Sequence, residues 1–312
     1  MKCENIDCRN GSKGETVKEI QTILKTLGFY QGKIDGDYGD MTVDAVKKYQ
    51  RTKSLLTDGI VGPVTCKSLN SNTSTSNSAI SYIKDITGHK FYKETILSAA
   101  ETFRKHIHNN KNYPTYLSMT DSNGKQFNVG RSAYMGIFED VSRFAVKNGR
   151  VPNYVVADGT ANNPLAIDYQ NNSVNCGPTT FSMAFQMVAK WVSEPTLAAQ
   201  AGTSSAGTSP DQMISLARKY NFNLNVINRN ISAVKKSLNS GAPVIAHIHT
   251  AYSGGKSCLG YSGSYGHWVL IYGVEGNYYL VADPTRGFKK CYSTSIDNAR
   301  SSTYMKYYEL LV

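Results

Sequence analysis

The stretch YQNNSVNCGPTTFSMAFQMVAKWV, Tyr169–Val192, predicts a buried helix that begins close to Cys176. Its apolar residues recur at helical spacing, at Phe181, Ala184, Phe185, Val188 and Val192. A proline is tolerated in the first turn of a helix, which suits Pro178. The partial positive charge at a helix N-terminus favours thiolate over thiol and lowers the pKa of a cysteine there. Cys176 is therefore the candidate nucleophile, and the alternative is a small buried cysteine at a helix start.

Gln170 and Asn175 precede Cys176 and are candidates for an oxyanion hole. A glutamine six residues before the cysteine resembles papain-like enzymes, in which its side-chain amide helps to hold the negative oxygen of the tetrahedral intermediate. The backbone N–H of the cysteine would be the second donor, and one such donor is typically worth about 3–4 kcal/mol. Asn175 is a further candidate, and its alternative role is that of a helix cap.

The stretch GHWVLIYGVEGNYYLVADPT, Gly266–Thr285, predicts two strands around the turn Glu275–Asn277. We expect a three-residue loop that pairs Val274 with Tyr278. The hairpin is important because it carries one histidine and one aspartate near its open end.

The register of this hairpin decides whether His267 and Asp283 can meet. With the expected loop, Asp283 lies opposite Val269, and His267 is two residues along on the same face. Their Cβ atoms would then be about 7–8 Å apart, which lets the two side chains touch. A change of one residue in the register would move them to opposite faces.

The order cysteine, histidine, aspartate resembles that of papain-like peptidases. The resemblance implies that His267 takes the proton of Cys176 and later protonates the leaving amine, while Asp283 fixes the imidazole tautomer. An acyl-thioester would form on the cysteine and be cleaved by water. This chemistry requires no cofactor or metal. The sequence leaves open whether a divalent cation such as Ca²⁺ stabilises or activates the protein.

Two further histidines, His247 and His249, alternate on one predicted strand face in GAPVIAHIH and could in principle ligate a metal. No carboxylate or cysteine at ligand spacing joins them, so we interpret them as strand residues that border the cleft. Cys258 and Cys291 have neither a helix start nor a preceding glutamine. Neither cysteine therefore competes with Cys176 as the nucleophile.

The catalytic region also resembles a named family. The stretches "Q.....NCGPTTFSMA", "GTSPDQMISLARKYNF", "GAPVIAHI" and "GHWVLIYGV...YYLVADP", within about 165–290, resemble the pseudomurein endoisopeptidases, which are close to the bacteriocin-processing cysteine peptidases. That resemblance implies cleavage of the ε-(alanyl)-lysine isopeptide bond of pseudomurein, the wall polymer of some methanogenic archaea. It also implies that Cys176, His267 and Asp283 are the catalytic triad. The expected fold for 159–312 is α+β and papain-like, with an antiparallel sheet.

The first 70 residues predict a small all-α domain. Apolar residues at helical spacing and glycines between them indicate about three short helices. The run "GSKG..V..IQ..L..LGFY.GKIDGDYG..T..AV..YQ.....DGIVGP.T...L" resembles the peptidoglycan-binding domain of many wall hydrolases. Asp35, Asp37 and Asp40 could form a cation loop, but their spacing is not that of a calcium hand, so we interpret them as turn residues.

A polar linker, 71–79, and a duplicated segment, 80–158, follow. At an offset of 38 residues, ILSAAETFRKHIHNNKNYPTYLSM lies over YMGIFEDVSRFAVKNGRVPNYVVA, which places Tyr116 on Tyr154. Each copy predicts an amphipathic helix, a polar turn and a strand-like exit. The pattern resembles the pseudomurein-binding repeat, so we expect a helical repeat domain that binds the wall. The alternative is that both tyrosines are core aromatics.

Composition limits the remaining choices. A formal charge of +11 without a dense basic block favours a polyanionic partner, and both acidic cell walls and nucleic acid qualify. No apolar run approaches the length of a membrane span, and the first residues have no secretory signal. The six cysteines are too few for a disulfide scaffold in a chain of 312 residues. Cys3 and Cys8 could form a bridge or bind metal, and local packing is the interpretation that we prefer.

Together these observations predict a monomeric, three-part lysin of a virus or provirus. It would be made in the host cytoplasm and, after release, would bind and cut pseudomurein, with no nucleic-acid partner and no membrane span. The alternatives are a murein endopeptidase of bacterial walls, a transglutaminase-like acyl transferase with the same triad, and an adhesin that only binds.

Overall fold

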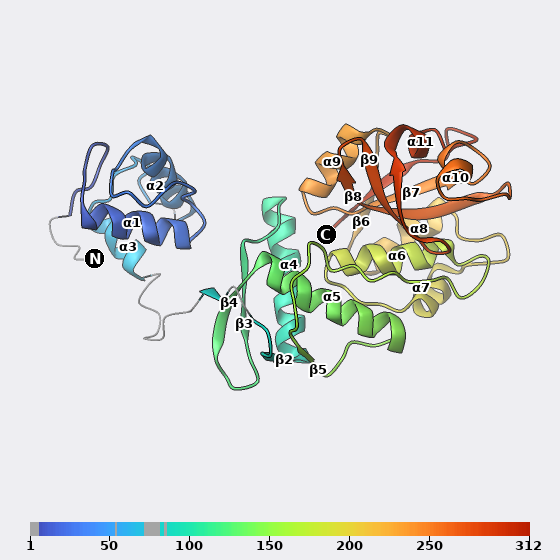
Figure 1. The fold of residues 1–312 in the computed structure, drawn as a ribbon, viewed down its shortest axis with the longest axis horizontal. Coiled ribbons are helices and arrows are strands. Elements are labelled where there is room, and N and C mark those ends of the chain that lie inside the picture. The colour runs from blue at the N-terminus through green and yellow to red at the C-terminus, as the bar shows by residue number, and fades with distance from the viewer. Residues whose placement is uncertain (1–5, 54, 72–81, 84–85) are drawn as a thin grey trace. The chain divides into compact units, whose positions relative to one another are not determined.

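The chain divides into two units, 1–79 and 80–312, in the computed structural model (Figure 1). The structure describes residues 6–53, 55–71, 82–83 and 86–312. Within these ranges no helix has the length and apolar character needed to cross a membrane.

Three amphipathic helices form the first unit: α1 (Glu15–Thr26), α2 (Asp40–Thr52) and α3 (Pro63–Ser71). The apolar faces of these helices meet in one core, which includes Val17, Ile20, Leu24, Val46, Tyr49 and Leu69. Burial of one such face is what stabilises helices this short in water. The predicted small helical domain is confirmed.

Two buried glutamines organise the turns between these helices. Gln21 accepts from the backbone N–H of Gly36 through Oε1 and donates to Asp35 Oδ1 through Nε2, both at 2.9 Å. Gln50 accepts from the N–H of Gly59 in the same way, at 2.9 Å. Both glycines have φ near +78°, a conformation that other residues rarely adopt. Asp35 therefore shapes a turn, as predicted.

Most of the predicted linker lies outside the described residues. Ser71 is the last residue of α3, and 72–79 are not described. Cys3 also lies outside the described residues, and Cys8 is a free thiol. Cys66 is a disulfide cysteine, which the sequence did not indicate.

The duplicated segment forms the first part of the second unit. Its elements are β1 (Tyr82–Ile83), β2 (Lys90–Tyr92), α4 (Lys93–Asn110), β3 (Tyr116–Thr120), β4 (Gln126–Gly130), α5 (Arg131–Asn148) and β5 (Tyr154–Val156). α5 starts at 131, which is 38 residues after α4 at 93, and β5 starts at 154, which is 38 residues after β3 at 116. β3 pairs with β4, and β2 pairs with β5, so the strands of each copy pair with those of the other.

The fold expected for this segment is corrected, and so is the alternative role of its two tyrosines. Strands flank each long helix, so the segment is α+β and not a helical repeat domain. The predicted strand-like exits are β3 and β5, but strands of three to five residues are too short to show a clear alternating pattern, so β2 and β4 were not predicted. Tyr116 is only partly buried and Tyr154 is 49% exposed, so neither is a core aromatic. The core instead contains Phe103, Tyr134 and Phe138.

The duplicated segment packs against residues of the predicted catalytic region. The Trp191 indole N–H donates to Ser142 Oγ at 2.9 Å, and its ring lies edge-on to Phe138 at 5.7 Å. The Arg104 guanidinium donates to the carbonyl of Ala189. Ala189 also belongs to the core cluster of the duplicated segment, so the two parts of the second unit share buried surface.

The rest of the second unit is built on one six-stranded sheet. Its helices are α6 (Cys176–Met187), α7 (Glu194–Ala201), α8 (Pro210–Lys219), α9 (Ile231–Asn239), α10 (Gly254–Ser257) and α11 (Ser293–Asp297). Its strands are β6 (Asn223–Ile227), β7 (Val244–His249), β8 (Gly266–Glu275), β9 (Tyr278–Asp283), β10 (Gly287–Tyr292) and β11 (Tyr307–Leu311). They lie in the order β10-β9-β8-β7-β11-β6 with antiparallel pairs. The expected α+β fold with an antiparallel sheet is confirmed.

Helices cover both faces of this sheet (Figure 1). Residues of α6, α7 and α8 pack on one face, in a cluster that includes Phe181, Leu197, Met213 and Leu270. Residues of α9 and α11 pack on the other face, with Val234, Val269 and Ile296. The N-terminus of α6 thereby comes to lie beside the start of β8, where Thr180 Oγ1 donates to the carbonyl of Trp268 at 3.0 Å.

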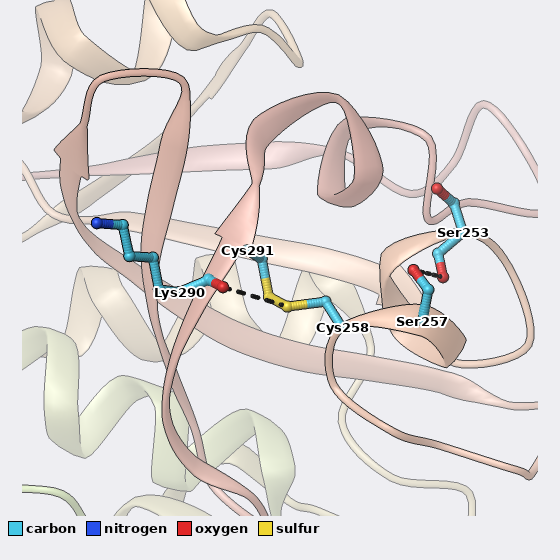
Figure 2. Close-up of a disulfide and its surroundings, with 5 residues drawn as sticks. All are labelled: Ser253, Ser257, Cys258, Lys290 and Cys291. Atoms are coloured by element: carbon cyan, nitrogen blue, oxygen red, sulfur yellow. Dashed lines mark hydrogen bonds between the residues drawn. A yellow bond between two sulfur atoms is a disulfide. The ribbon is translucent and has the colours of Figure 1, made fainter.

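A disulfide joins Cys258, just after α10, to Cys291 on β10 (Figure 2). The Cys258 sulfur also lies 3.6 Å from the carbonyl of Lys290, and the Ser257 hydroxyl donates to the carbonyl of Ser253 at 3.0 Å. The disulfide and the contact with Lys290 attach the loop between β7 and β8 to the edge of the sheet. Their spacing in the sequence did not predict this disulfide, because the two cysteines are 33 residues apart and only the folding of the sheet brings them together.

Replacing both Cys258 and Cys291 by serine is expected to destabilise the second unit. A bridge that closes a loop of 33 residues stabilises a fold by roughly 3–4 kcal/mol, chiefly by restricting the unfolded chain. The measurement is the thermal unfolding transition of the second unit under non-reducing conditions, with Cys8→Ser as the control because Cys8 is a free thiol of the first unit. An unchanged transition in the double variant would contradict the expectation.

Candidate active site

Cys176 is the first residue of α6, as expected, and its side chain is 8% exposed. Gly177 follows it closely packed, since a Cβ there would lie 2.9 Å from the Cβ of Thr208. Pro178 occupies the first turn, where its missing N–H would be unpaired in any case. The thiol is thus held at the positive end of a helix, with backbone N–H groups close to it.

The β8–β9 hairpin differs from the expected one at its turn. Its loop is the two-residue Gly276–Asn277, with Glu275 paired to Tyr278, and not a three-residue loop. A β-bulge at Tyr272 then inserts one extra residue into β8. The bulge offsets the shorter loop, so the register at the open end of the hairpin is the one that was predicted.

This restored register brings His267 and Asp283 together. Leu270 pairs with Ala282, and continuing the pairing by one residue places Asp283 opposite Val269. His267 Nε2 lies 3.3 Å from Asp283 Oδ2, and both side chains are almost fully buried. Without the bulge, the two-residue loop would shift the pairing by one residue and separate the two side chains.

The electrostatics of the three groups favour charge separation. Burial raises the pKa of the Cys176 thiol, but hydrogen bonding to His267 and the imidazolium charge lower it more, so the net pKa lies below its ordinary value. Burial lowers the pKa of His267, yet Asp283 and Cys176 together raise it to about 9. For Asp283, burial raises the pKa and the contact with His267 lowers it, with a lowered net value. A thiolate and an imidazolium can therefore coexist here.

The carboxylate of Asp283 is held by the turn that follows β9. Its Oδ1 accepts from the backbone N–H groups of Thr285 at 2.8 Å and Arg286 at 3.0 Å. Oδ2 faces His267. The imidazole therefore meets a carboxylate whose position is fixed by the backbone.

The two candidates for the oxyanion hole are both engaged in other contacts. Gln170 Nε2 donates to the carbonyl of Asn172 at 2.6 Å, and its Oε1 accepts from the Thr285 hydroxyl at 3.1 Å. Asn175 is at the N-cap position of α6 but makes no side-chain cap, so its alternative role as a cap is corrected. Its Nδ2 donates instead to the buried carboxylate of Glu194.

The strand histidines, His247 and His249, make separate contacts. His247 stacks on Trp268 at 4.2 Å, and burial, followed by the nearby Arg229 charge, lowers its pKa to about 4. His249 Nδ1 accepts from the N–H of Ala251 at 3.3 Å. Among the described residues, no three His, Cys, Asp or Glu side chains are grouped to hold a metal ion.

Comparison with known families gives the geometry a context. Residues 164–299 match the family described as "Peptidase C39 family". The chain carries a C39-family cysteine peptidase domain. The matched range of this C39 domain contains Gln170, Asn175, Cys176, His267 and Asp283. Residues 13–69 match the family described as "Putative peptidoglycan binding domain", so a wall-binding domain lies before the C39 domain.

Relatives of the wall-binding domain are bacterial wall enzymes. The N-acetylmuramoyl-L-alanine amidase CwlM of Mycobacterium tuberculosis is 46% identical over 56 residues, which cover 18% of this chain and 14% of that protein. The spore cortex-lytic enzyme of Halalkalibacterium halodurans is 44% identical over 55 residues, 18% of this chain and 17% of that protein. The match thus spans less than a fifth of the length of either relative.

A solved structure is similar to the C39 domain. A C39-like peptidase from Bacillus anthracis aligns with 47% of this chain and 94% of its own, at 15% identity and a TM-score of 0.39.

Sequence reasoning missed two residues that contact the candidate site. Glu194 holds Asn175, the neighbour of Cys176, and Tyr261 places its hydroxyl between His267 and Asp283. Neither stands in a recognisable motif, because each comes from a loop or helix start far from its partners along the chain. Only the packed structure reveals them.

Proposed function

We propose that the chain is a cell-wall-lytic cysteine endopeptidase that cuts the peptide cross-links of the wall to which it binds. One observation carries this proposal: the Cys176 thiol lies at a helix start beside a buried imidazole, His267, that faces the carboxylate of Asp283. The peptidoglycan-binding domain supports a wall polymer as the substrate.

The proposed mechanism uses the chain's own groups. His267 directs Nε2 at Asp283, which leaves Nδ1 for the thiol of Cys176. The thiolate attacks the scissile carbonyl carbon, and the imidazolium gives its proton to the leaving amine as the C–N bond breaks. His267 then takes a proton from water, whose hydroxide attacks the acyl-thioester. The carbon–sulfur bond then breaks, with Cys176 leaving as the thiolate and the product departing as a carboxylic acid. The proton taken from water stays on His267, so the thiolate and imidazolium pair is restored.

The oxyanion hole would combine the backbone N–H of Cys176 with the side-chain amide of Gln170. Gln170 N donates to the carbonyl of Pro284 at 2.9 Å, next to Asp283, so its backbone is fixed to the turn after β9. Its Nε2 must exchange the carbonyl of Asn172 for the substrate oxygen when the substrate binds. Asn175 would act through the contact with Glu194, by holding the start of α6.

Pseudomurein and murein are the two candidate polymers. The resemblance of the catalytic region implies the ε-(alanyl)-lysine isopeptide bond of pseudomurein in methanogenic archaea as the bond that is cut. The matches of 13–69 to bacterial wall enzymes favour murein cross-links as the second candidate. Both are amide bonds between amino acids, so one cysteine mechanism serves either.

We further propose a monomeric viral or proviral lysin that acts on the wall after release from the host cytoplasm. Wall-binding and catalytic domains on one chain raise the local concentration of the enzyme on an insoluble substrate. The Cys258–Cys291 disulfide suits an oxidising location outside the cell.

The test is digestion of purified pseudomurein and murein sacculi by the full chain, with mass spectrometry of the released fragments. New amino groups at peptide cross-links in one polymer support the proposal and name the bond. Arms with a chelator and with added Ca²⁺ test the expectation that catalysis needs no cation. Intact cross-links in both polymers, or release of sugar ends only, would refute the proposal.

The rate of digestion is expected to follow a bell-shaped pH profile. The active form pairs a thiolate with an imidazolium, so the rate rises as Cys176 ionises, at a pH below that of an ordinary cysteine. The raised pKa of His267 keeps the imidazolium charged up to about pH 9 and lets it lose its proton above that. Initial rates across this range provide the measurement, and a rate that still climbs well above pH 9 would contradict the assignment.

A further inference from the structure

We propose that Tyr261 is a positioning residue of the active site, whose hydroxyl connects His267 to Asp283 and sets the tautomer of the imidazole. The inference rests on the proposed cysteine peptidase site and adds a residue to it.

The hydroxyl of Tyr261 contacts both members of the pair. It lies 3.0 Å from His267 Nε2, and 2.8 Å and 3.0 Å from the two carboxylate oxygens of Asp283. An ionised carboxylate can only accept, so the single hydroxyl proton points to Asp283. The phenol oxygen then accepts from His267, which requires the imidazole to carry a proton on Nε2. Nδ1 is therefore the nitrogen that accepts the proton of the Cys176 thiol.

The contact through Tyr261 is better made than the direct one. His267 Nε2 and Asp283 Oδ2 are 3.3 Å apart, just beyond the usual range of about 2.7–3.2 Å for such a bond. Both steps through the tyrosine fall within the usual range. Asp283 Oδ1 is already shared with two backbone N–H groups. The Tyr261 hydroxyl therefore provides much of the restraint on the orientation of the imidazole.

The ring of Tyr261 is itself fixed. It is 4% exposed and lies edge-on to the His267 ring at 5.0 Å. The guanidinium of Arg286 lies over the Tyr261 ring, 4.9 Å from the ring centre. The backbone N–H of Tyr261 donates to the carbonyl of Gly255 at 3.1 Å. Cys258, three residues before Tyr261, is joined by a disulfide to Cys291 of β10 (Figure 2). The loop thus presents the hydroxyl at a defined position.

The titratable and charged groups around the imidazole come from several elements: Cys176 of α6, Asp283 of β9, Tyr261 and Tyr265 of the loop before β8, His247 of β7, and Arg286 over Tyr261. Of the tyrosines, Tyr261 is the one within hydrogen-bond distance of both ring and carboxylate. Removing the Tyr261 hydroxyl alone should therefore change the hydrogen bonding of the imidazole without altering these other charges.

The experiment compares the full chain with Tyr261→Phe by the pH dependence of Cys176 alkylation with iodoacetamide, measured at the Cys176 peptide by mass spectrometry. Loss of one hydrogen bond to the imidazolium form should raise the apparent pKa of the thiol by about one unit. On whichever wall polymer is digested, kcat should fall about tenfold with little change in KM. An unchanged alkylation profile would overturn the proposal.

Tyr279→Phe is the matched control. Tyr279, on β9, is also a buried tyrosine, and its hydroxyl donates to a carboxylate, Asp297, at 3.0 Å. It should lower stability in the same way but leave the alkylation profile of Cys176 unchanged. If both variants shift the profile equally, the effect of Tyr261 is only structural and the proposal falls.

A second measurement covers the case in which Tyr261→Phe does not fold. Nitrogen-15 NMR of histidine-labelled, unmodified chain reads the tautomer of His267 directly, above the pH at which it loses its proton. A proton on Nε2 is expected, and a proton on Nδ1 would overturn the proposal. Neither alkylation nor NMR needs a wall substrate, so a failed digestion assay would refute the proposed function and leave this inference standing.

Discussion

Replacing Cys176 by alanine is expected to abolish digestion of the wall, with a loss on the order of 10⁵–10⁶-fold in rate. The physical reason is that no other group near His267 can form the acyl intermediate. Binding to sacculi should persist, because the wall-binding domain is a separate unit with its own core. The measurement is release of amino groups from sacculi, together with co-sedimentation of the variant with the same material.

The matched control for this variant is Cys8→Ser. Cys8 is the other free thiol among the described residues, and it lies in the wall-binding unit. We expect full activity from it, which would exclude a general effect of thiol loss. Lysis by Cys176→Ala at the rate of the unmodified chain would refute the proposed mechanism.

The second large effect is expected from Asp283→Ala. The change removes the charge that raises the pKa of His267, and it removes the acceptor of Tyr261, Thr285 N and Arg286 N. We expect a loss of about 10³–10⁴-fold in kcat/KM, and a thiol pKa closer to that of an ordinary cysteine. Rates and Cys176 alkylation as functions of pH provide the two measurements.

Two companion variants separate charge from structure. Asp283→Asn keeps an acceptor for Thr285 N and Arg286 N but removes the charge, so its rate should fall between those of the unmodified chain and the alanine variant. Asp297→Ala removes a partly buried carboxylate that accepts from Tyr279 and Tyr307, away from the site. It should lower stability without changing the pH profile. Activity of Asp283→Ala equal to that of Asp297→Ala would show that Asp283 has no special part in the chemistry.

The hairpin of β8 and β9 shows how far pattern reasoning reaches. The two strands and the shared face of His267 and Asp283 follow from alternation and spacing. The loop length does not, because Glu275, Gly276 and Asn277 allow either a two-residue or a three-residue turn. The expected register is found at the open end only because the bulge at Tyr272 corrects for the shorter loop. A bulge depends on packing against both neighbouring strands, which no local pattern encodes.

The duplicated segment could also be predicted only in part. Its period of 38 residues could be predicted, because two amphipathic helices carry it. The strand-like exits after the two helices were also predicted, and they are β3 and β5. The strands before the helices, β2 and β4, could not be predicted, because each is short and pairs with a strand of the other copy. The prediction of a helical repeat domain was therefore incomplete.

By itself the sequence determined the local features of this protein: the helix that starts at Cys176, the strands that carry His267 and Asp283, and the three helices of the wall-binding domain. Each follows from a periodicity or a spacing within one short stretch. The tertiary structure alone decided the hydroxyl of Tyr261 between imidazole and carboxylate, the hold of Glu194 on Asn175, and the disulfide behind the active-site loop. These contacts join residues that are far apart in the sequence and are brought together by packing of the sheet and its loops. The local sequence around one residue therefore does not predict its partner.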